Sequence, residues 1–356
     1  MAVITILVNK GLNESQIKQI FSLYPIGEKY RSHPNPDKYL AHSIDSAKAM
    51  SNLTEEEMQD PLFISGTIGK NDRGYHLDIL NFQEYMVKKY QLSISEGNFF
   101  TYNGKCYEAC PDDYLNCLCQ KELGAHRKLF TKGLLKDLIH YAKGEAIVDI
   151  NKVREDQVNY LTLQNGLYSL KEECLLPHTP SIFTTNLLPY DYDPNAQCPQ
   201  FIKYLNEIFM DKADVIEFVQ EAVGYGFHKS IPMPAIFFLT GDGSNGKSVF
   251  INTLTNLYGE ENTCSISFNA LSNEYYLLSL FGKMINISGE TPQRKQVNTD
   301  MVKAVVAGDW VTGRTPYKPP TKFRPHAKHF LAMNAMPEIE DTSHGMWRRI
   351  YPVDFP

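Results

Sequence analysis

Apolar residues recur at helical spacing near the start of the chain, between Ile17 and Tyr24. Loops that contain Pro and Gly follow, and a second helical pattern runs from about Tyr39 to Met50. The pattern predicts a small, mainly helical domain over residues 1–65.

From residue 66 to residue 198 the apolar pattern alternates between helical and strand periods. Helices are predicted over 82–90, 112–123 and 129–141. Two short apolar runs flank Asn165-Gly166, a pair that supplies the two positive φ angles of a type I′ turn, so a β-hairpin is predicted there. Several prolines then keep the chain extended as far as Cys198. We expect a mixed α+β domain over 66–198.

Residues 199–234 carry two amphipathic helical patterns. The first begins with Pro199 in its first turn, and the second runs from about Asp214 to Tyr225. Each has an apolar face that needs a partner, so the two helices are expected to pack together as a helical collar or linker.

A fully apolar run begins at Ala235, and the helical pattern after Lys247 is separated from it by a Gly-rich loop. In such a loop, backbone N–H groups close around phosphate oxygens, and the helix dipole favours the negative charge. Lys247 is expected to reach the β- and γ-phosphates of ATP, and Ser248 to ligate Mg²⁺. The alternative is a Gly-rich turn with a chance Lys-Ser. The predicted cofactor-binding residues are Gly241, Asp242, Gly243, Ser244, Asn245, Gly246, Lys247, Ser248 and Val249.

Two further apolar strands end in polar residues. The strand that begins near Lys283 leads to Glu290, and the strand that begins at Phe330 leads to Asn334. In P-loop NTPases, an acid at the end of the strand beside the P-loop strand holds Mg²⁺ or orients the attacking water. Glu290 is the candidate for this role, and Asn334 for a hydrogen bond to the γ-phosphate. Taken alone, Glu290 is better explained as an ordinary exposed residue at a strand end, and Asn334 as a turn residue.

An arginine pair, Arg348 and Arg349, precedes a last apolar strand. A guanidinium matches phosphate oxygens bidentately, so the pair suits an arginine finger offered to a neighbouring subunit. A surface salt bridge is the alternative.

The net charge of the chain is −6, yet no acid occurs from Trp310 to Pro337. The predicted hairpin at 311–324 interleaves cations with aromatic rings, which a surface tracking single-stranded DNA requires. A solvated charged hairpin remains the alternative. The candidate DNA-binding residues are Arg314, Tyr317, Lys318, Lys322, Phe323 and Arg324.

Composition and the spacing of particular residues bear on the location of the protein, the state of its cysteines and metal binding. No apolar run approaches the roughly 18 residues of a membrane span, and the first residues lack a signal-peptide pattern, so a cytoplasmic protein is expected. The seven cysteines, without a secretory context, indicate reduced thiols. The cysteines between Cys106 and Cys119 fit no paired zinc pattern, and Asp191 and Asp193 are typical of turn chemistry near proline.

The order of these motifs resembles a superfamily 3 helicase: a Gly-x-x-x-Asn-Gly-Lys-Ser loop, a strand ending Gly-Glu-Thr, Gly-Asp before a basic hairpin, a strand ending in Asn, and Arg-Arg. The resemblance is greatest to the primase-helicases of phages, plasmids and mobile elements, which are related to the poxvirus primase-helicase. It extends to the segments 165–170, 177–180, 192–201 and 224–225, and more weakly to 21–29.

The resemblance implies an α/β fold, an AAA+-like P-loop NTPase over 235–356 with a central parallel sheet, preceded by mixed α+β domains. It implies a ring, usually hexameric, that hydrolyses ATP between subunits and draws single-stranded DNA through its pore. Lys247 and Ser248 then bind phosphate and Mg²⁺, Glu290 polarises water, Asn334 senses the γ-phosphate, and Arg348 or Arg349 acts in trans. A separate primase or origin-binding protein is a further expected partner.

The sequence departs from that family in two places. Gly289 stands where many such helicases have a second acid, and the chain ends at Pro356, where the family continues into a C-terminal domain that is therefore expected to be missing. No primase carboxylate constellation is visible. The expected activity is an ATP-dependent DNA helicase or translocase in replication of a mobile element. A DNA-binding remnant without catalysis and a small-molecule P-loop kinase remain alternatives.

Overall fold

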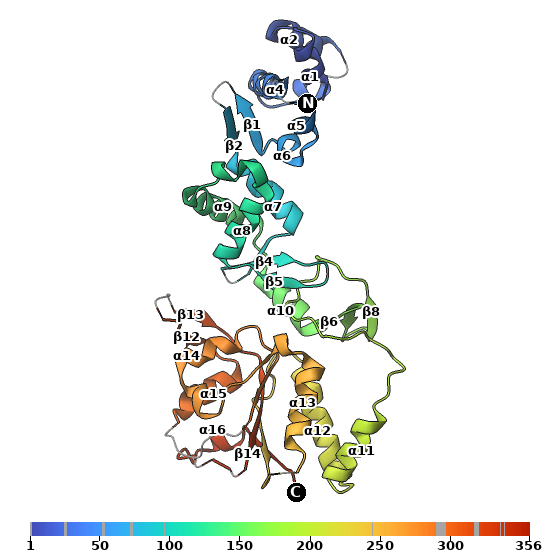
Figure 1. The fold of residues 1–356 in the computed structure, drawn as a ribbon, viewed down its shortest axis with the longest axis vertical. Helices are drawn as coiled ribbons and strands as arrows, with labels where there is room; N and C mark the ends of the chain where they lie inside the picture. Colours follow the sequence, from blue (N-terminus) through green and yellow to red (C-terminus); the bar gives the residue numbers. More distant parts are fainter. Residues whose placement is uncertain are drawn as a thin grey trace. The chain divides into compact units, whose positions relative to one another are not determined.

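The computed structural model describes residues 2–24, 27–51, 54–71, 74–95, 97–243, 245–289, 297–316, 320–334, 336–337 and 339–356 (Figure 1). The chain forms two compact units. The first comprises Met1–Thr101 and Ala109–Val148, and the second comprises Tyr102–Glu108 and Asp149–Pro356. The finer division at residues 65, 198 and 234 stays a prediction.

The first part of unit one is helical, as the sequence pattern predicts. Asn13 begins the second helix with a capping box that it shares with Gln16. Ile17 and Leu40 are buried between the helices. The elements are α1 (Ala2–Asn9), α2 (Glu14–Leu23), α3 (Glu28–Arg31), α4 (Pro36–Ser51), α5 (Glu55–Gln59) and α6 (Pro61–Ile64), followed by β1 (Ile68–Asn71) and β2 (Gly74–Leu77).

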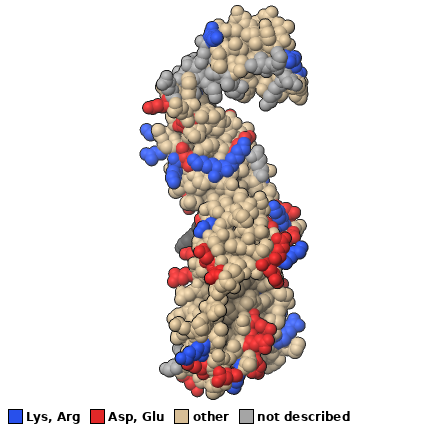
Figure 2. Space-filling view, turned by 90° about the vertical axis from the view of Figure 1, so that its right-hand side faces the viewer, with Lys and Arg blue, Asp and Glu red and all other residues tan. Residues whose placement is uncertain are grey.

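The second part of unit one packs three longer helices around a separate core. Phe82, Leu115 and Leu138 are fully buried there. On the face that Figure 2 shows, Lys and Arg atoms form a band across this unit. The elements are α7 (Ile79–Tyr90), β3 (Ser93–Ser95), β4 (Asn98–Tyr102), α8 (Asp112–Leu123), the 3₁₀ helix η2 (Gly124–Leu129) and α9 (Lys132–Glu145). The strand β5 (Tyr107–Ala109), which completes the sheet of β3 and β4, belongs mostly to unit two.

The cysteines are all free, and no cluster of three His, Cys, Asp or Glu side chains suited to a metal ion occurs among the described residues. Burial raises the pKa of Cys119 to about 12, so its thiol stays protonated. Within the same described residues, every helix is too short or too polar to span a lipid bilayer.

Unit two begins with α10 (Ile150–Asn159) and a three-stranded sheet of β6 (Tyr160–Leu163), β7 (Gly166–Ser169) and β8 (Cys174–Leu176). The predicted hairpin is present, but its predicted turn is wrong. Leu163 pairs with Gly166, so Gln164 and Asn165 form the turn, and neither they nor Gly166 has a positive φ.

The two turn residues that suggested a type I′ turn serve packing instead. A Cβ on Gly166 would lie 2.5 Å from the Leu176 carbonyl, so glycine is needed for the close approach of β8. The Asn165 amide donates to Tyr192 O at 3.0 Å and accepts from Tyr192 N at 2.9 Å.

The core of unit two is a sheet of five parallel strands in the order β10-β11-β14-β9-β15. We expected the strand leading to Glu290 to lie beside the strand of the Gly-rich loop. That expectation is wrong, because β14 lies between β11 and β9. The strands are β9 (Ile236–Thr240), β10 (Thr263–Cys264), β11 (Ile285–Ser288), β14 (Lys328–Met333) and β15 (Ile350–Asp354).

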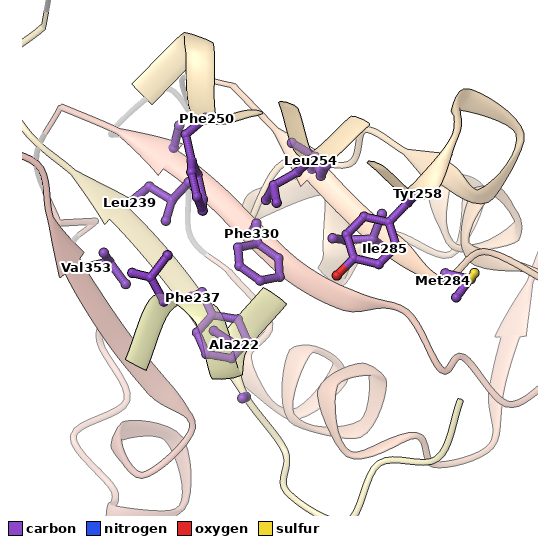
Figure 3. Packing of buried hydrophobic residues seen from close by; sticks show 14 of the residues in the cluster. Ala222, Phe237, Leu239, Phe250, Leu254, Tyr258, Met284, Ile285, Phe330 and Val353 are labelled. Carbon is purple, nitrogen blue, oxygen red and sulfur yellow. The ribbon is translucent and has the colours of Figure 1, made fainter. Parts of the chain in front are cut away.

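Both faces of this sheet are buried, which explains the uninterrupted apolar runs. Phe237 and Leu239 of β9 pack on one face with Phe250 and Leu254 (Figure 3). The alternate residues of β9 pack on the other face against a second cluster. In Figure 1, α11 (Pro199–Ile208), α12 (Ala213–Gly226) and α13 (Lys247–Tyr258) lie on one side of the sheet, and α14 (Glu274–Leu277), α15 (Thr299–Ala307) and α16 (His344–Trp347) lie on the other.

Candidate nucleotide site

The Gly-rich loop, residues 241–246, joins β9 to α13 at the carboxyl edge of the sheet. Thr240 pairs with Met333 of β14 on one side and with Asp354 of β15 on the other. The residues that follow this row are Gly241, Asn334 and Phe355, so three strand ends meet at one edge. The register thus brings Asn334 to the level of the loop, as the sequence order suggested.

The loop depends on its glycines. Gly246 has a φ of 87°, and a Cβ there would lie 2.5 Å from Ile208 Cδ1 of α11. A Cβ on Gly241 would lie 2.3 Å from the Phe355 carbonyl oxygen. Gly243, with a φ of 101°, has no atom within 4 Å of its Cβ direction, which leaves one side of the loop open to a ligand. Ser244 lies outside the described residues.

Lys247 is the first residue of α13, and only 8% of it is exposed. Its Nζ donates to Gly241 O at 2.6 Å and to Asn245 Oδ1 at 2.8 Å. The ammonium group is therefore held inside the loop by neutral acceptors. A phosphate is a stronger acceptor for an ammonium group than either oxygen, so the arrangement fits an anion in the loop. The other predicted cofactor-binding residues here, Asp242, Ser248 and Val249, are exposed.

Tyr204 of α11 supports the loop from below, a contact that our sequence analysis missed. Its hydroxyl donates to Gly246 O at 2.9 Å, and burial raises the pKa of Tyr204 to about 12, which keeps that proton in place. The sequence feature that could have indicated this contact is the Tyr204 hydroxyl, which lies on the otherwise apolar helix face that carries Phe201 and Ile208.

The carboxylates at this edge are only partly described. Glu290, the predicted catalytic and Mg²⁺-binding residue, lies outside the described residues, and β11 ends before it at Ser288. Asp354, which the sequence analysis did not single out, is exposed at the end of β15. Its Oδ1 accepts from Thr240 Oγ1 at 3.4 Å.

The arginine pair lies at the opposite edge of the sheet. Ile236 N, at the start of β9, donates to Arg349 O at 2.7 Å. The Arg349 guanidinium is half-buried and donates to its own Gly345 O, whereas Arg348 is exposed. The structure therefore does not bring either arginine to the loop of the same chain.

The basic hairpin is present as β12 (Val311–Gly313) and β13 (Thr321–Phe323), an antiparallel pair. Phe323 was predicted to stack on DNA, and this is wrong: it is 1% exposed, and its ring packs edge-on against Phe281 at 5.6 Å. Arg314 forms an ion pair with Glu274 at 2.9 Å. Tyr317 and Lys318 lie outside the described residues.

Lys322 and Arg324 of the hairpin region lie close to the ring of Trp310, an aromatic residue that the sequence analysis did not single out. Lys322 Nζ and Arg324 Cζ lie 5.4 and 5.0 Å from the centre of the Trp310 ring, which is 43% exposed. Trp310 is thus the exposed aromatic side chain of the described hairpin region.

Comparisons with known proteins match different parts of the chain. Residues 82–210 match the family described as D5 N terminal like, and residues 239–349 match a family of unknown function, DUF5906. A protein named "Putative helicase" of Acanthamoeba polyphaga mimivirus is 26% identical over 240 residues, covering 64% of this chain and 24% of that protein. A "Putative helicase" of Sputnik virophage is 25% identical over 252 residues, covering 63% of this chain and 30% of that protein.

The chain thus spans less than a third of the length of either viral protein. Among solved structures, the apo structure of the NrS-1 C terminal region aligns with a TM-score of 0.49 at 12% identity. That alignment covers 78% of this chain and 62% of the NrS-1 chain.

Proposed function

We propose that this chain, which belongs to the phage and viral primase-helicase family, binds ATP with Mg²⁺ at the Gly-rich loop. It couples hydrolysis to movement on single-stranded DNA during replication of a mobile element. The observation that carries this proposal is the position of Lys247 Nζ inside the loop, at the edge where Asn334 also lies.

The residues present suit a nucleoside triphosphate with Mg²⁺. The open side of the loop at Gly243 admits a phosphate chain, and Ser248 presents an exposed hydroxyl in the first turn of α13. Mg²⁺ keeps several waters and takes few protein ligands when phosphates supply the rest. Bound Mg²⁺ offsets the charge of the phosphates.

Each side chain then has a defined task. Lys247 exchanges its two loop acceptors for phosphate oxygens, and Ser248 would hold the Mg²⁺ ion through its hydroxyl. Asn334 donates its amide to the terminal phosphate or the attacking water. Glu290 accepts a proton from that water. Because Gly289 stands where many such helicases have a second acid, Glu290 has this role alone.

The site is completed by a second copy of the chain in this proposal. Arg348 is exposed at the far edge of the sheet, so it is free to face a neighbouring loop while Arg349 stays bound to Gly345 O. A closed, hexameric ring provides such a neighbour for every loop.

ATP hydrolysis measured with and without single-stranded DNA tests the proposal. We expect a DNA-stimulated rate that Lys247→Ala abolishes. Phosphate transfer to a small acceptor indicates a kinase instead, and DNA binding without hydrolysis indicates a remnant. Either result refutes the proposal.

A further inference from the structure

The strongest unassigned surface lies in unit one, where the sequence analysis found no chemistry. Between Lys121 and Lys143 there are six Lys and Arg residues and two acids, so this stretch carries a local charge of +4 in a chain of net charge −6. We define the basic face as the five exposed cations that follow α8: Arg127, Lys128, Lys132, Lys136 and Lys143.

Helix geometry puts these cations on one side. Lys132, Lys136 and Lys143 of α9 are four and seven residues apart, which places them on one stripe of the helix. Arg127 and Lys128 end η2, just before the first turn of α9. The opposite side of α9, with Leu134 and Leu138, packs in the core. The cations therefore face solvent because their helix is held by its other side.

The nearby acids leave this charge uncompensated. Glu122 accepts from Lys89 Nζ at 2.6 Å and from the hydroxyls of Tyr85 and Tyr90 at 2.9 and 2.5 Å. Asp137 is the other acid of the stretch. Among the residues that the structure describes, no ion pair includes a cation of the basic face.

One exposed ring lies beside these charges. His140 is exposed and follows Lys136 by four residues, so it lies near the lysines on α9. Tyr141 is 40% exposed but follows Leu134 by seven residues, so it lies on the other side of the helix. Cations with an exposed ring beside them suit a polymer of phosphates with unpaired bases, since the ring stacks on bases that a duplex keeps paired.

We propose that the basic face binds the backbone of single-stranded DNA, as a second contact outside the unit that holds the nucleotide loop. The hairpin of unit two offers fewer contacts to DNA than the sequence predicted, because Arg314 is paired with Glu274 and Phe323 is buried. A second DNA-binding surface would supply further contacts. The nucleic-acid partner rests on the proposed function, whereas the surface itself rests on charge and exposure.

The test uses the full chain and a fluorescein-labelled single-stranded oligodeoxynucleotide of mixed sequence, titrated at several salt concentrations. Lys128→Gln with Lys132→Gln and Lys136→Gln should weaken binding and lower the log–log salt slope by about 2, or about 0.7 for each lost contact. Replacing the same three lysines by Arg should retain affinity. His140→Leu should weaken binding by a factor that does not change with salt.

A matched triple variant controls for net charge: Lys38→Gln, Lys171→Gln and Lys212→Gln alter exposed lysines elsewhere. An equal loss in this control, or parental affinity and slope in the first variant, overturns the proposal. The double variant Lys322→Gln with Arg324→Gln distinguishes DNA binding by the basic face from DNA binding by the hairpin of unit two. If only this hairpin variant loses binding, the basic face is excluded while the proposed function stands. If the parent binds no DNA, this proposal fails, and the basal ATPase rate still tests the nucleotide site.

Discussion

The side-chain amide of Asn245 donates to the Phe355 carbonyl at 2.6 Å, which ties the Gly-rich loop to the end of β15. The same amide accepts from Lys247 Nζ at 2.8 Å through its oxygen. Because one planar group makes both bonds, the position of the Lys247 ammonium is coupled to the last strand of the sheet.

Asn245→Ala should therefore weaken nucleotide binding while leaving the fold intact. The bond from Asn245 to Phe355 O holds the loop in the shape that receives the phosphates, and one such hydrogen bond contributes about 0.5–1.5 kcal/mol. We expect the Kd for a fluorescent ATP analogue to rise roughly 2- to 12-fold.

Asn165→Ala is the matched control, because the Asn165 side-chain amide also makes two hydrogen bonds, both to the backbone of Tyr192 and away from the loop. It should reduce thermal stability by a comparable amount without changing the Kd. Equal nucleotide affinities in the two variants would contradict a special role for Asn245.

Tyr204→Phe should loosen the loop from α11. The change removes the hydroxyl that donates to Gly246 O and keeps the ring, so the stability loss should be about 0.5–1.5 kcal/mol. We expect a higher KM for ATP with a smaller change in kcat, measured by steady-state hydrolysis. Tyr225→Phe removes a hydroxyl bonded to Met233 O at 2.7 Å and should leave KM unchanged. A KM that is equal in both variants would reduce Tyr204 to a structural role.

Sequence periodicity predicted most helices and strands of unit two because its sheet is buried on both faces. Runs such as Ile236–Thr240 are uninterrupted, and Lys247 begins the predicted helix. The order of the strands was not predictable in this way. Parallel strands joined by long connections carry no local signal of their neighbours, so nothing in the sequence indicated that β14 separates β11 from β9.

The local geometry of the Gly-rich loop was predictable from residue type, as at Gly246 with its positive φ, whereas the role of Lys247 in nucleotide binding stays a prediction. The exposure of a side chain was not predictable, because tertiary packing decides it. Phe323 and Lys322 are adjacent in one strand and point to opposite faces, yet the sequence analysis grouped them on one DNA surface. The support from Tyr204 depends on a tertiary contact over 42 residues, which helical spacing cannot show.

Phe323→Ala should destabilise unit two instead of weakening DNA stacking. The side chain is 1% exposed, and removing a buried phenylalanine costs about 3–5 kcal/mol through lost burial and the cavity that remains. Urea unfolding should show this loss. Lys322→Gln, at the neighbouring exposed position, should stay within about 0.5 kcal/mol of the parent. A stable Phe323→Ala protein with weak DNA binding would restore the original prediction.

Lys328 should make folding stability depend on pH above neutrality. Its side chain is 2% exposed, and burial lowers its pKa from 10.5 to about 7. Between those two values the unfolded chain holds more protons than the folded chain, so stability should rise with pH by up to about 1.4 kcal/mol per unit.

Lys328→Met should flatten that part of the profile. Nζ donates to the carbonyls of Ser230 and His326 at 2.9 and 3.0 Å, so the variant should also lose stability at every pH. The readout is therefore the slope of unfolding free energy between pH 7 and 10, taken as the difference from the parent. Lys229, whose pKa burial lowers to about 8, contributes the same sign in both proteins and cancels in that difference. Parallel profiles would show that Lys328 stays charged in the folded state.

Arg348 and Arg349 should differ sharply when each is replaced by Ala. Arg349 donates to Gly345 O and its Nε is buried, so its loss should mainly reduce stability. Arg348 is exposed at the edge of the sheet opposite the loop, and it can reach a nucleotide only in a neighbouring chain. If it acts there, Arg348→Ala should bind ATP normally and hydrolyse it roughly 10³-fold or more slowly.

Mixing the Arg348→Ala variant with Lys247→Ala protein should recover part of the activity, because a mixed assembly contains interfaces with one intact loop and one intact arginine. Recovery with Arg349→Ala but not with Arg348→Ala would reverse the assignment, since an arginine supplied in trans is the one whose loss a neighbour can complement.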